Sequence, residues 1–288
     1  MDAQRALIVA SASAEGGDGL ARSRTIAEDV ARDAGRILLE GWGTRPAIEY
    51  KDDIDLVTEF DRRSEQLIVA RLAAAFPDDT IIGEEGSAVG PPRRGREGRV
   101  WFIDPLDGTT NFSHGLPLFS VSIGLTIDGV AMVGAVEAPA LGWSFSGAVG
   151  GGAAWNGRPI TPSSVDSIGR ALVVTGFPYS RQPVQDNLAE WAALIAAAQG
   201  TRRLGSAALD LSFVACGWLD AYWERALHPW DLVAGAAIVN AAGGRATEID
   251  GTPFVGDTGR VLATNGPLHE QMVAILHRVA AVAGGPWP

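Results

Sequence analysis

Two aspartates separated by a proline and a leucine, Asp104-Pro105-Leu106-Asp107, are the residues of this sequence best suited to chemistry. They follow directly on an apolar run, Val100 to Ile103, which is typical of a buried strand. Because the proline restricts the backbone between the acids, both carboxylates and the Leu106 carbonyl could converge on one or two cations. Gly108-Thr109-Thr110 comes next, at a predicted helix start where free backbone N–H groups can bind an anion. The stretch therefore indicates a cation site beside a phosphate site.

Other acids lie where predicted strands end or helices begin: Asp61, Glu84-Glu85 and Asp231. Each has a plain structural explanation, as a solvated helix acid, a charged turn and the N-cap of a helix from Leu232. Oxygen ligands nevertheless suit magnesium, calcium or manganese, whereas zinc sites favour cysteine and histidine. The four histidines are scattered without ligand spacing, at His114, His228, His269 and His277.

The elements that must position these acids alternate along the chain. Apolar residues three and four apart predict an amphipathic helix from Ser23, ended by Gly41 and Gly43, and a second helix from Thr58. Alternating helices and strands predict an α/β layer architecture, above all in the second half. The other expected elements are strands at 48–51, 80–83, 121–125, 130–136 and 143–148, a hairpin turn near 155–159, a strand at 171–175, helices at 186–198 and 208–217, a strand at 220–224, a helix at 232–242, and a final strand and helix.

Composition narrows the class of protein. Hydrophobic residues make up 47% of the chain and charged residues 20%, so a sizeable core can form. The net charge of -11 and the single short basic run at 93–96 argue against nucleic acid and membrane surfaces as partners. No apolar stretch is long enough to cross a membrane. Cys216 is the only cysteine, which excludes an intrachain disulfide and favours a reducing, cytoplasmic location.

Several of these motifs together resemble one known family. Asp104 to Phe112, DPLDGTTNF, resembles the first signature of the inositol monophosphatase family, the magnesium-dependent, lithium-sensitive phosphatases. Trp230 to Gly235, together with Ala241 to Gly244, resembles the second signature. Gly83-Glu84-Glu85 and Asp55 to Asp61 also match, in the family's order. The matches extend over about residues 23 to 280, so the resemblance covers nearly the whole chain.

The resemblance implies a role for individual residues. Two or three Mg²⁺ ions would be held by Glu84, Asp104, the Leu106 carbonyl, Asp107 and Asp231. Thr109 with Glu84, supported by Asp61, would position and deprotonate the attacking water. The amides of Gly108 and Thr109 would hold the phosphate, and the alcohol would be bound by Asp107, Ala207 and Glu224. The alternative for Glu224 is a surface acid at the end of a strand.

The resemblance also implies the fold, a layered α-β-α-β-α sandwich of the inositol monophosphatase and fructose-1,6-bisphosphatase type, as a homodimer. We expect residues 1–20 to be a flexible leader, because 6–14 resembles a signal peptide only weakly. Residues 21–162 would form an N-terminal half with most metal ligands. Residues 163–288 would form a C-terminal half with Asp231 and the residues that select the substrate.

The predicted activity is hydrolysis of inositol 1-phosphate to inositol and phosphate by attack of an activated water. The substrate could instead be another small phosphorylated polyol or amino alcohol. The enzymatic alternatives are histidinol-phosphatase, fructose-1,6-bisphosphatase and phosphoadenosine-phosphate phosphatase. The non-enzymatic alternative is a binding protein of a transcription complex, without direct contact to nucleic acid.

Overall fold

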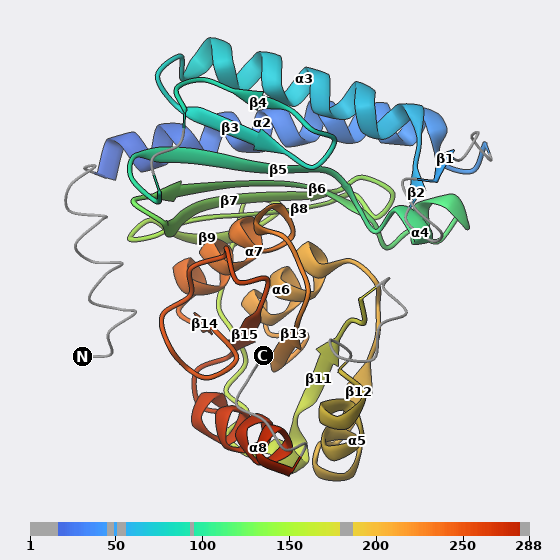
Figure 1. Cartoon of the computed structure of the whole chain (residues 1–288), viewed down its shortest axis with the longest axis vertical. Helices are drawn as coiled ribbons and strands as arrows, with labels where there is room; N and C mark the ends of the chain where they lie inside the picture. The colour runs from blue at the N-terminus through green and yellow to red at the C-terminus, as the bar shows by residue number, and fades with distance from the viewer. Residues whose placement is uncertain (1–16, 45–48, 51–55, 93–94, 179–186, 283–288) are drawn as a thin grey trace.

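The computed structural model describes residues 17–44, 49–50, 56–92, 95–178 and 187–282. These residues form five layers in which two sheets alternate with three pairs of helices (Figure 1). Three separate hydrophobic cores fill the spaces between the layers. The predicted α-β-α-β-α sandwich is therefore confirmed.

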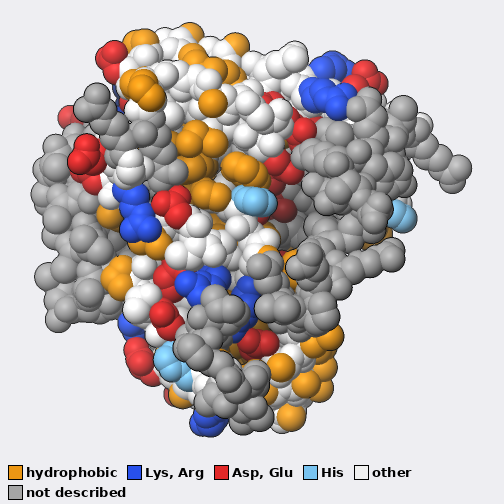
Figure 2. Space-filling model, in the orientation of Figure 1, with side chains coloured by type: hydrophobic (Ala, Val, Ile, Leu, Met, Phe, Trp, Pro, Cys, Tyr) orange, Lys and Arg blue, Asp and Glu red, His pale blue; other side chains and the backbone are white. Residues whose placement is uncertain are grey.

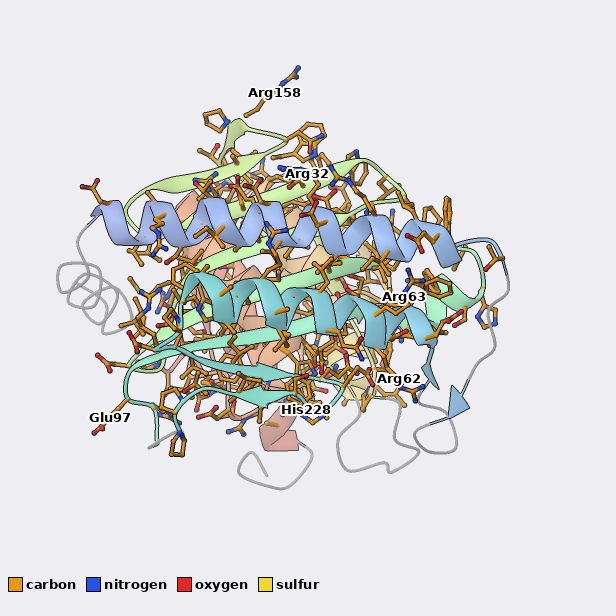
Figure 3. The ribbon with its side chains drawn as sticks, turned by 90° about the horizontal axis from the view of Figure 1, so that it is seen from above. Arg32, Arg62, Arg63, Glu97, Arg158 and His228 are labelled. Carbon is orange, nitrogen blue, oxygen red and sulfur yellow. The ribbon has the colours of Figure 1, made fainter. Side chains whose placement is uncertain are left out.

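The first layer consists of α2 (Gly17–Gly41) and α3 (Glu59–Ala75), which lie side by side over one face of the larger sheet (Figure 3). The helix α3 begins next to Thr58, as predicted, and Thr58 caps it by accepting a hydrogen bond from the Phe60 N–H. The start of α2 was predicted too late, at Ser23, because Leu20 already belongs to its buried stripe. Residues 1–16 of the expected leader lie outside the described residues.

The larger sheet has eight strands in the order β10-β9-β8-β7-β6-β5-β3-β4. Among the described strands of this sheet, only β3 and β5 pair in parallel, with Gly83 opposite Ile103. Because parallel strands end at the same edge, Glu84 follows β3 next to the point where β5 reaches Asp104. The strands are β3 (Thr80–Gly83), β4 (Ala88–Val89), β5 (Arg99–Asp107), β6 (Ser120–Ile127), β7 (Val130–Ala138), β8 (Trp143–Ala148), β9 (Gly152–Trp155) and β10 (Arg158–Ile160).

The middle layer consists of α6 (Ala207–Ala215) and α7 (Pro229–Ala242), which lie between the two sheets (Figure 1). Both helices are apolar on nearly all sides, which is typical of a helix buried on two faces. Gly134 of β7 allows the close approach of α7, since a Cβ there would overlap the Ala234 carbonyl. The core around these helices contains residues from both predicted halves, so the division near residue 162 stays a prediction.

The smaller sheet has five strands in the order β12-β11-β13-β15-β14, and α5 (Leu188–Ala197) and α8 (His269–Val282) pack on its outer side. The sequence predicted a single strand after Gly243-Gly244, whereas the chain forms two antiparallel strands there, β14 and β15. The strands are β11 (Leu172–Thr175), β12 (Gly200–Arg202), β13 (Ala221–Glu224), β14 (Arg245–Thr247) and β15 (Val261–Thr264), preceded by a 3-10 turn at Ile168–Arg170.

Two small elements complete the fold. A two-stranded sheet pairs β1 (Glu49–Tyr50) with β2 (Leu56–Val57), and the segment between them, 51–55, lies outside the described residues. The short helix α4 (Thr109–Ser113) begins directly after β5, as predicted. None of the described helices combines the length and apolar character needed to cross a membrane.

Candidate active site

The end of β5 and the start of α4 form the base of a cavity. The pairing of β5 with β6 shifts between Asp104 and Asp107, so the backbone bulges at the intervening proline and leucine. Asp104 Oδ1 accepts a hydrogen bond of 2.9 Å from the Leu106 N–H. The Thr109 hydroxyl donates to the Leu106 carbonyl over 3.0 Å, which fixes the turn. Gly108, with a φ of 88°, makes the sharp change of direction into α4.

Asp107 connects the larger sheet to helix α6. Its carboxylate accepts hydrogen bonds from the Ser206 hydroxyl at 2.5 Å, the Ala208 N–H at 2.8 Å and the Ala207 N–H at 3.2 Å, all at the start of α6. An acid at a helix N-terminus is stabilised by these otherwise unpaired donors. Burial nevertheless raises the pKa of Asp107 to about 6, because the hydrogen bonds offset only part of the desolvation.

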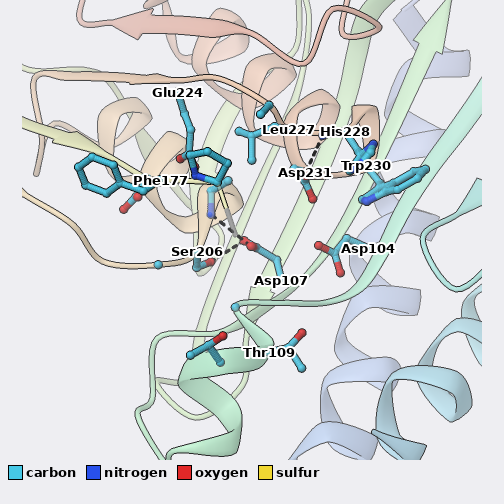
Figure 4. Close-up of a pocket in the computed structure, with 18 of the residues that line it drawn as sticks. Asp104, Asp107, Thr109, Phe177, Ser206, Glu224, Leu227, His228, Trp230 and Asp231 are labelled. Carbon is cyan, nitrogen blue, oxygen red and sulfur yellow. Dashed lines mark hydrogen bonds between the residues drawn. The ribbon is translucent and has the colours of Figure 1, made fainter. Parts of the chain in front are cut away.

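Asp231 reaches the same cavity from the first turn of α7. Its Oδ2 accepts a hydrogen bond of 2.7 Å from the His228 N–H. The helix begins at Pro229, so the predicted start at Leu232 was too late, and the structural alternative of Asp231 as an N-cap is wrong. Proline suits the first position of a helix because that position needs no N–H donor. Figure 4 shows the side chains of Asp104, Asp107 and Asp231 directed toward one common space.

Glu84 completes the acidic end of the cavity, hereafter the acidic cluster of Glu84, Asp104, Asp107 and Asp231. The turn that carries Glu84 is held by the buried Glu65 of α3, which accepts hydrogen bonds from the N–H groups of Glu85 and Ser87 at 2.8 and 3.1 Å. Burial raises the pKa of Asp104 and of Asp231 well above the usual range, and the charge of Glu84 adds to the rise. Simultaneous ionisation of all the carboxyl groups in the cluster is therefore unfavourable without a positive charge nearby.

Asp61 lies behind the cavity rather than in its wall. It is buried in the first turn of α3 and accepts hydrogen bonds from the Thr58 N–H at 2.9 Å and the Thr58 hydroxyl at 2.5 Å. One turn further, the Ser64 hydroxyl donates to the Pro105 carbonyl at 3.1 Å, which ties α3 to the turn between the two aspartates. Burial raises the pKa of Asp61 to about 7.

Glu224 lies at the other end of the cavity, where β13 ends. Its Oε2 accepts a hydrogen bond of 2.6 Å from the Tyr222 hydroxyl. Glu224 is only 6% exposed, so the alternative of a surface acid is wrong. Burial raises the pKa of Glu224 to about 7. The cavity has a volume of about 290 Å³, and every predicted site residue except Asp61 contributes to its wall. Figure 4 shows Glu224 on the opposite side of Asp107 from Asp104.

The structure adds residues that the motifs did not identify. Ser206 holds Asp107, Tyr222 holds Glu224, and Glu65 holds the turn of Glu84. Arg203 and Asp210 also line the cavity. The sequence contained a signal for Ser206, which has the residue type and position of an N-cap, and for Tyr222, which lies two residues before Glu224 on the same face of β13. The contact of Glu65 depends on the packing of α3 beside the turn after β3.

The acidic cluster has the donor chemistry of a site for hard cations. All its donors are carboxylate or carbonyl oxygens, the ligands that Mg²⁺ prefers. The raised pKa values of Asp104 and Asp231 indicate that a positive charge would stabilise the ionised cluster. In the part of the chain that the structure describes, no three or more acidic, histidine or cysteine side chains are grouped so that they could already hold a metal ion. The cluster fits divalent cations by the chemistry of its donors rather than by a preformed ligand set.

Comparisons with known proteins agree with this site. The chain is 43% identical over 249 residues to an inositol-1-monophosphatase of Synechocystis sp., covering 86% of each chain. It is 40% identical over 246 residues to the Nus factor SuhB of Pseudomonas aeruginosa, covering 83% of this chain and 90% of that protein. The solved structure of an inositol monophosphatase from Anabaena (Nostoc) sp. has a TM-score of 0.82 at 41% identity, covering 92% of this chain and 99% of that one.

Fold, site and relatives together define a phosphoric monoester hydrolase. The model of the inositol monophosphatase family matches residues 20–281, and the chain belongs to that family.

Proposed function

We propose that the protein hydrolyses the phosphate monoester of a small polyol with Mg²⁺, and that inositol 1-phosphate is its preferred substrate. The observation that carries the proposal is one cavity with an acidic cluster at one end and the buried carboxylate of Glu224 at the other. A phosphate ester with several hydroxyl groups has matching chemistry at both ends. Relatives named inositol monophosphatase support the choice of alcohol.

Two or three Mg²⁺ ions would be held by the acidic cluster and the Leu106 carbonyl. Bound there, the ions would neutralise the phosphate charge, lower the pKa of bound water and stabilise the leaving oxygen. This would also explain how a chain of net charge -11 binds a phosphate. Lithium inhibition, a property of the family, is expected for the same site.

The chain's own groups would prepare the reaction. Thr109 and Glu84 would orient the attacking water and accept its proton. Asp61, which lies outside the cavity wall, would help to position them. The N–H groups of Gly108 and Thr109 would donate to the phosphate, since the first amides of a helix have no partner within it. No protein nucleophile is needed in this scheme, because positioning and charge stabilisation supply most of the rate gain in phosphoryl transfer.

The alcohol part of the substrate would be bound on the side of Asp107 that faces Glu224. Glu224 would accept a hydrogen bond from a ring hydroxyl, with the Tyr222 hydroxyl holding the carboxylate in place. The backbone at Ala207 and one oxygen of Asp107 would contact the same ring. Asp107 Oδ1 accepts a hydrogen bond from the Ala207 N–H at the start of α6, so the orientation of that helix would set the position of the ring.

A kinetic panel tests the substrate. The purified protein is assayed with inositol 1-phosphate, histidinol phosphate, fructose 1,6-bisphosphate and phosphoadenosine phosphate, with and without Mg²⁺. We expect the highest kcat/KM for inositol 1-phosphate, loss of activity in chelator and inhibition by Li⁺. A preference of about a hundredfold for histidinol phosphate would overturn the choice of alcohol, because one well-placed polar contact can account for such a ratio.

A role in a transcription complex is the second candidate, and the similarity to the Nus factor SuhB favours it. Direct binding to RNA is not part of this candidate, because the chain has a net charge of -11. In the face shown in Figure 2, the coloured, described residues place basic side chains among acidic and apolar ones. Recovery of transcription proteins from a lysate by an Asp104→Asn variant would support the role, and recovery of none would oppose it.

We also propose a cytoplasmic homodimer. The described part of α5 exposes two large apolar side chains, Leu188 at 57% and Ile195 at 55%, which a second copy could cover. Sedimentation velocity of the purified protein tests the oligomeric state, and a monomer at micromolar concentration would contradict the proposal.

A further inference from the structure

We propose that Asp210 of α6 is a second specificity residue, which accepts a hydrogen bond from a hydroxyl of the substrate's alcohol beside the hydroxyl bound by Glu224. The inference rests on the proposed function, since it assumes a polyol phosphate. It assigns a role to a buried acid that lies outside the acidic cluster and takes no part in the scheme above.

Asp210 is placed to act on the alcohol. It lines the same cavity as Glu224 and Ala207 and is only 1% exposed. Residues three apart lie on the same face of a helix, so Asp210 follows Ala207 on the side of α6 that borders the cavity. The first turn of α6 also holds Asp107. One helix thus fixes the position of the acidic cluster relative to Asp210.

The carboxylate of Asp210 has an unsatisfied oxygen. Its Oδ1 is fully buried and has no hydrogen-bond partner in the part of the chain that the structure describes. By contrast, Asp107 has donors from Ser206 and Ala208, and Glu224 has the Tyr222 hydroxyl. A buried carboxylate oxygen without a donor is costly. A ligand in the cavity that brings a donor would remove this cost.

Asp210 has both acidic and basic neighbours. Burial raises the pKa of Asp210 well above its usual range, the charges of Glu224 and Asp107 add to the rise, and Arg203 opposes it. Arg203 also lowers the pKa of Glu224, so its positive charge acts on both acids. Within the proposed function, the donor that a polyol phosphate brings to this carboxylate is a hydroxyl group. Two hydroxyls of one ring could then bind Asp210 and Glu224 together.

The test compares two phosphate esters: inositol 1-phosphate, whose ring has further hydroxyl groups, and phenyl phosphate, whose ring has none. Asp210→Asn keeps the size of the side chain but replaces one acceptor oxygen by a donor group. We expect the ratio of kcat/KM for inositol 1-phosphate to kcat/KM for phenyl phosphate to fall about 10- to 100-fold, the effect of one hydrogen bond to a charged group. The inhibition constant of inorganic phosphate should stay within about twofold, because phosphate binds at the other end of the cavity.

Asp220→Asn is the matched control. Asp220 is also a buried acid, but it accepts hydrogen bonds from Ser163 and the Leu172 N–H at the opposite end of β13 from Glu224. This variant should change thermal stability but not the substrate ratio.

Two results would overturn the inference. One is an unchanged ratio in Asp210→Asn. The other is an equal fall for both substrates with weaker inhibition by phosphate, which would show a purely structural role. The wild-type panel tests the proposed function separately: if histidinol phosphate is preferred, that proposal fails, whereas the Asp210→Asn ratio still decides the inference about hydroxyl binding.

Discussion

The carboxylate of Asp104 lies in the middle of the acidic cluster, where burial and the charge of Glu84 both disfavour its ionised form. Asp104→Asn should lower kcat/KM by on the order of 1,000-fold or more, because a group proposed to hold the metal is lost. In chelator, the same variant should unfold at a higher temperature than the wild type, because a repulsive charge is gone. Activity assays, calorimetric Mg²⁺ titration and thermal melts measure these effects.

A second buried aspartate provides the control for Asp104. Asp79 lies in the same half of the molecule but is paired with Arg99 at 2.9 Å and with the Trp101 indole N–H at 2.7 Å. Asp79→Asn should lower stability and leave kcat/KM nearly unchanged. Full activity in Asp104→Asn, or lower stability in chelator, would contradict the assignment of Asp104 to the metal site.

Cys216 follows the end of α6 and is half-buried. Burial raises the pKa of its thiol to about 12, so almost no thiolate exists near neutral pH. Because the thiolate is the reactive form, we expect iodoacetamide to label the folded protein at pH 7.5 at least about tenfold more slowly than the unfolded protein. Mass spectrometry over time measures the rate, and fast labelling of the folded chain would refute this expectation.

Single residues were the most predictable part of the site. The turn from Asp104 to Thr109 could be predicted because its acids, proline and glycine are adjacent in sequence. The partners of those residues could not. Asp107 receives its donors from Ser206 and Ala208, about a hundred residues later, and only the packing of α6 against the larger sheet brings them together.

At the scale of elements, the turn from β5 into α4 depends on Gly108. Its φ of 88° is rarely adopted by other residues, and a Cβ would lie 3.0 Å from the Leu118 carbonyl and 3.1 Å from the Gly205 carbonyl. Gly108→Ala should therefore displace α4 and the adjoining Thr109, lowering kcat/KM by about 100-fold or more, as misplacement by an ångström can. Steady-state kinetics with inositol 1-phosphate measures the loss.

Gly115, just beyond the other end of α4, is the control for Gly108. Its φ is 77°, but no atom lies within 4 Å of the position of a Cβ. Gly115→Ala should lower the free energy of unfolding by about 1 kcal/mol through backbone strain alone. The variant should keep the activity of the wild type. Equal losses of activity in both alanine variants would show that strain, rather than the contacts at Gly108, causes the effect.

Element types were predicted better than element limits. The strand Trp143–Ala148 has its predicted limits because turn residues bound it on both sides. The starts of α2 and α7 were predicted too late because polar or proline-containing first turns look like loops in sequence. The shift of α7 matters for function, since it places Asp231 inside the helix and directs its side chain from the first turn.

For the whole molecule, the acids of the cavity make folding depend on pH. Burial raises the pKa of Asp61 from 3.8, and that of Glu224 from 4.5, to about 7. At pH values between the ordinary pKa of these groups and about 7, the folded chain binds more protons than the unfolded chain. The free energy of unfolding must therefore fall as pH rises through this range. Without divalent cations, the stability that these groups contribute is therefore present below about pH 4 and lost as pH rises through about 7.

A double variant, Asp61→Asn with Glu224→Gln, isolates this contribution. Between about pH 5 and 8 in chelator, we expect the free energy of unfolding of the wild type to fall by on the order of a few kcal/mol relative to that of the double variant. Chemical unfolding at several pH values measures the difference. Adding Mg²⁺ at pH 8 should stabilise the wild type in proportion to the logarithm of its concentration, because the ions bind only the folded chain. A difference that stays constant with pH would mean that neither carboxyl is held in its protonated form by the fold.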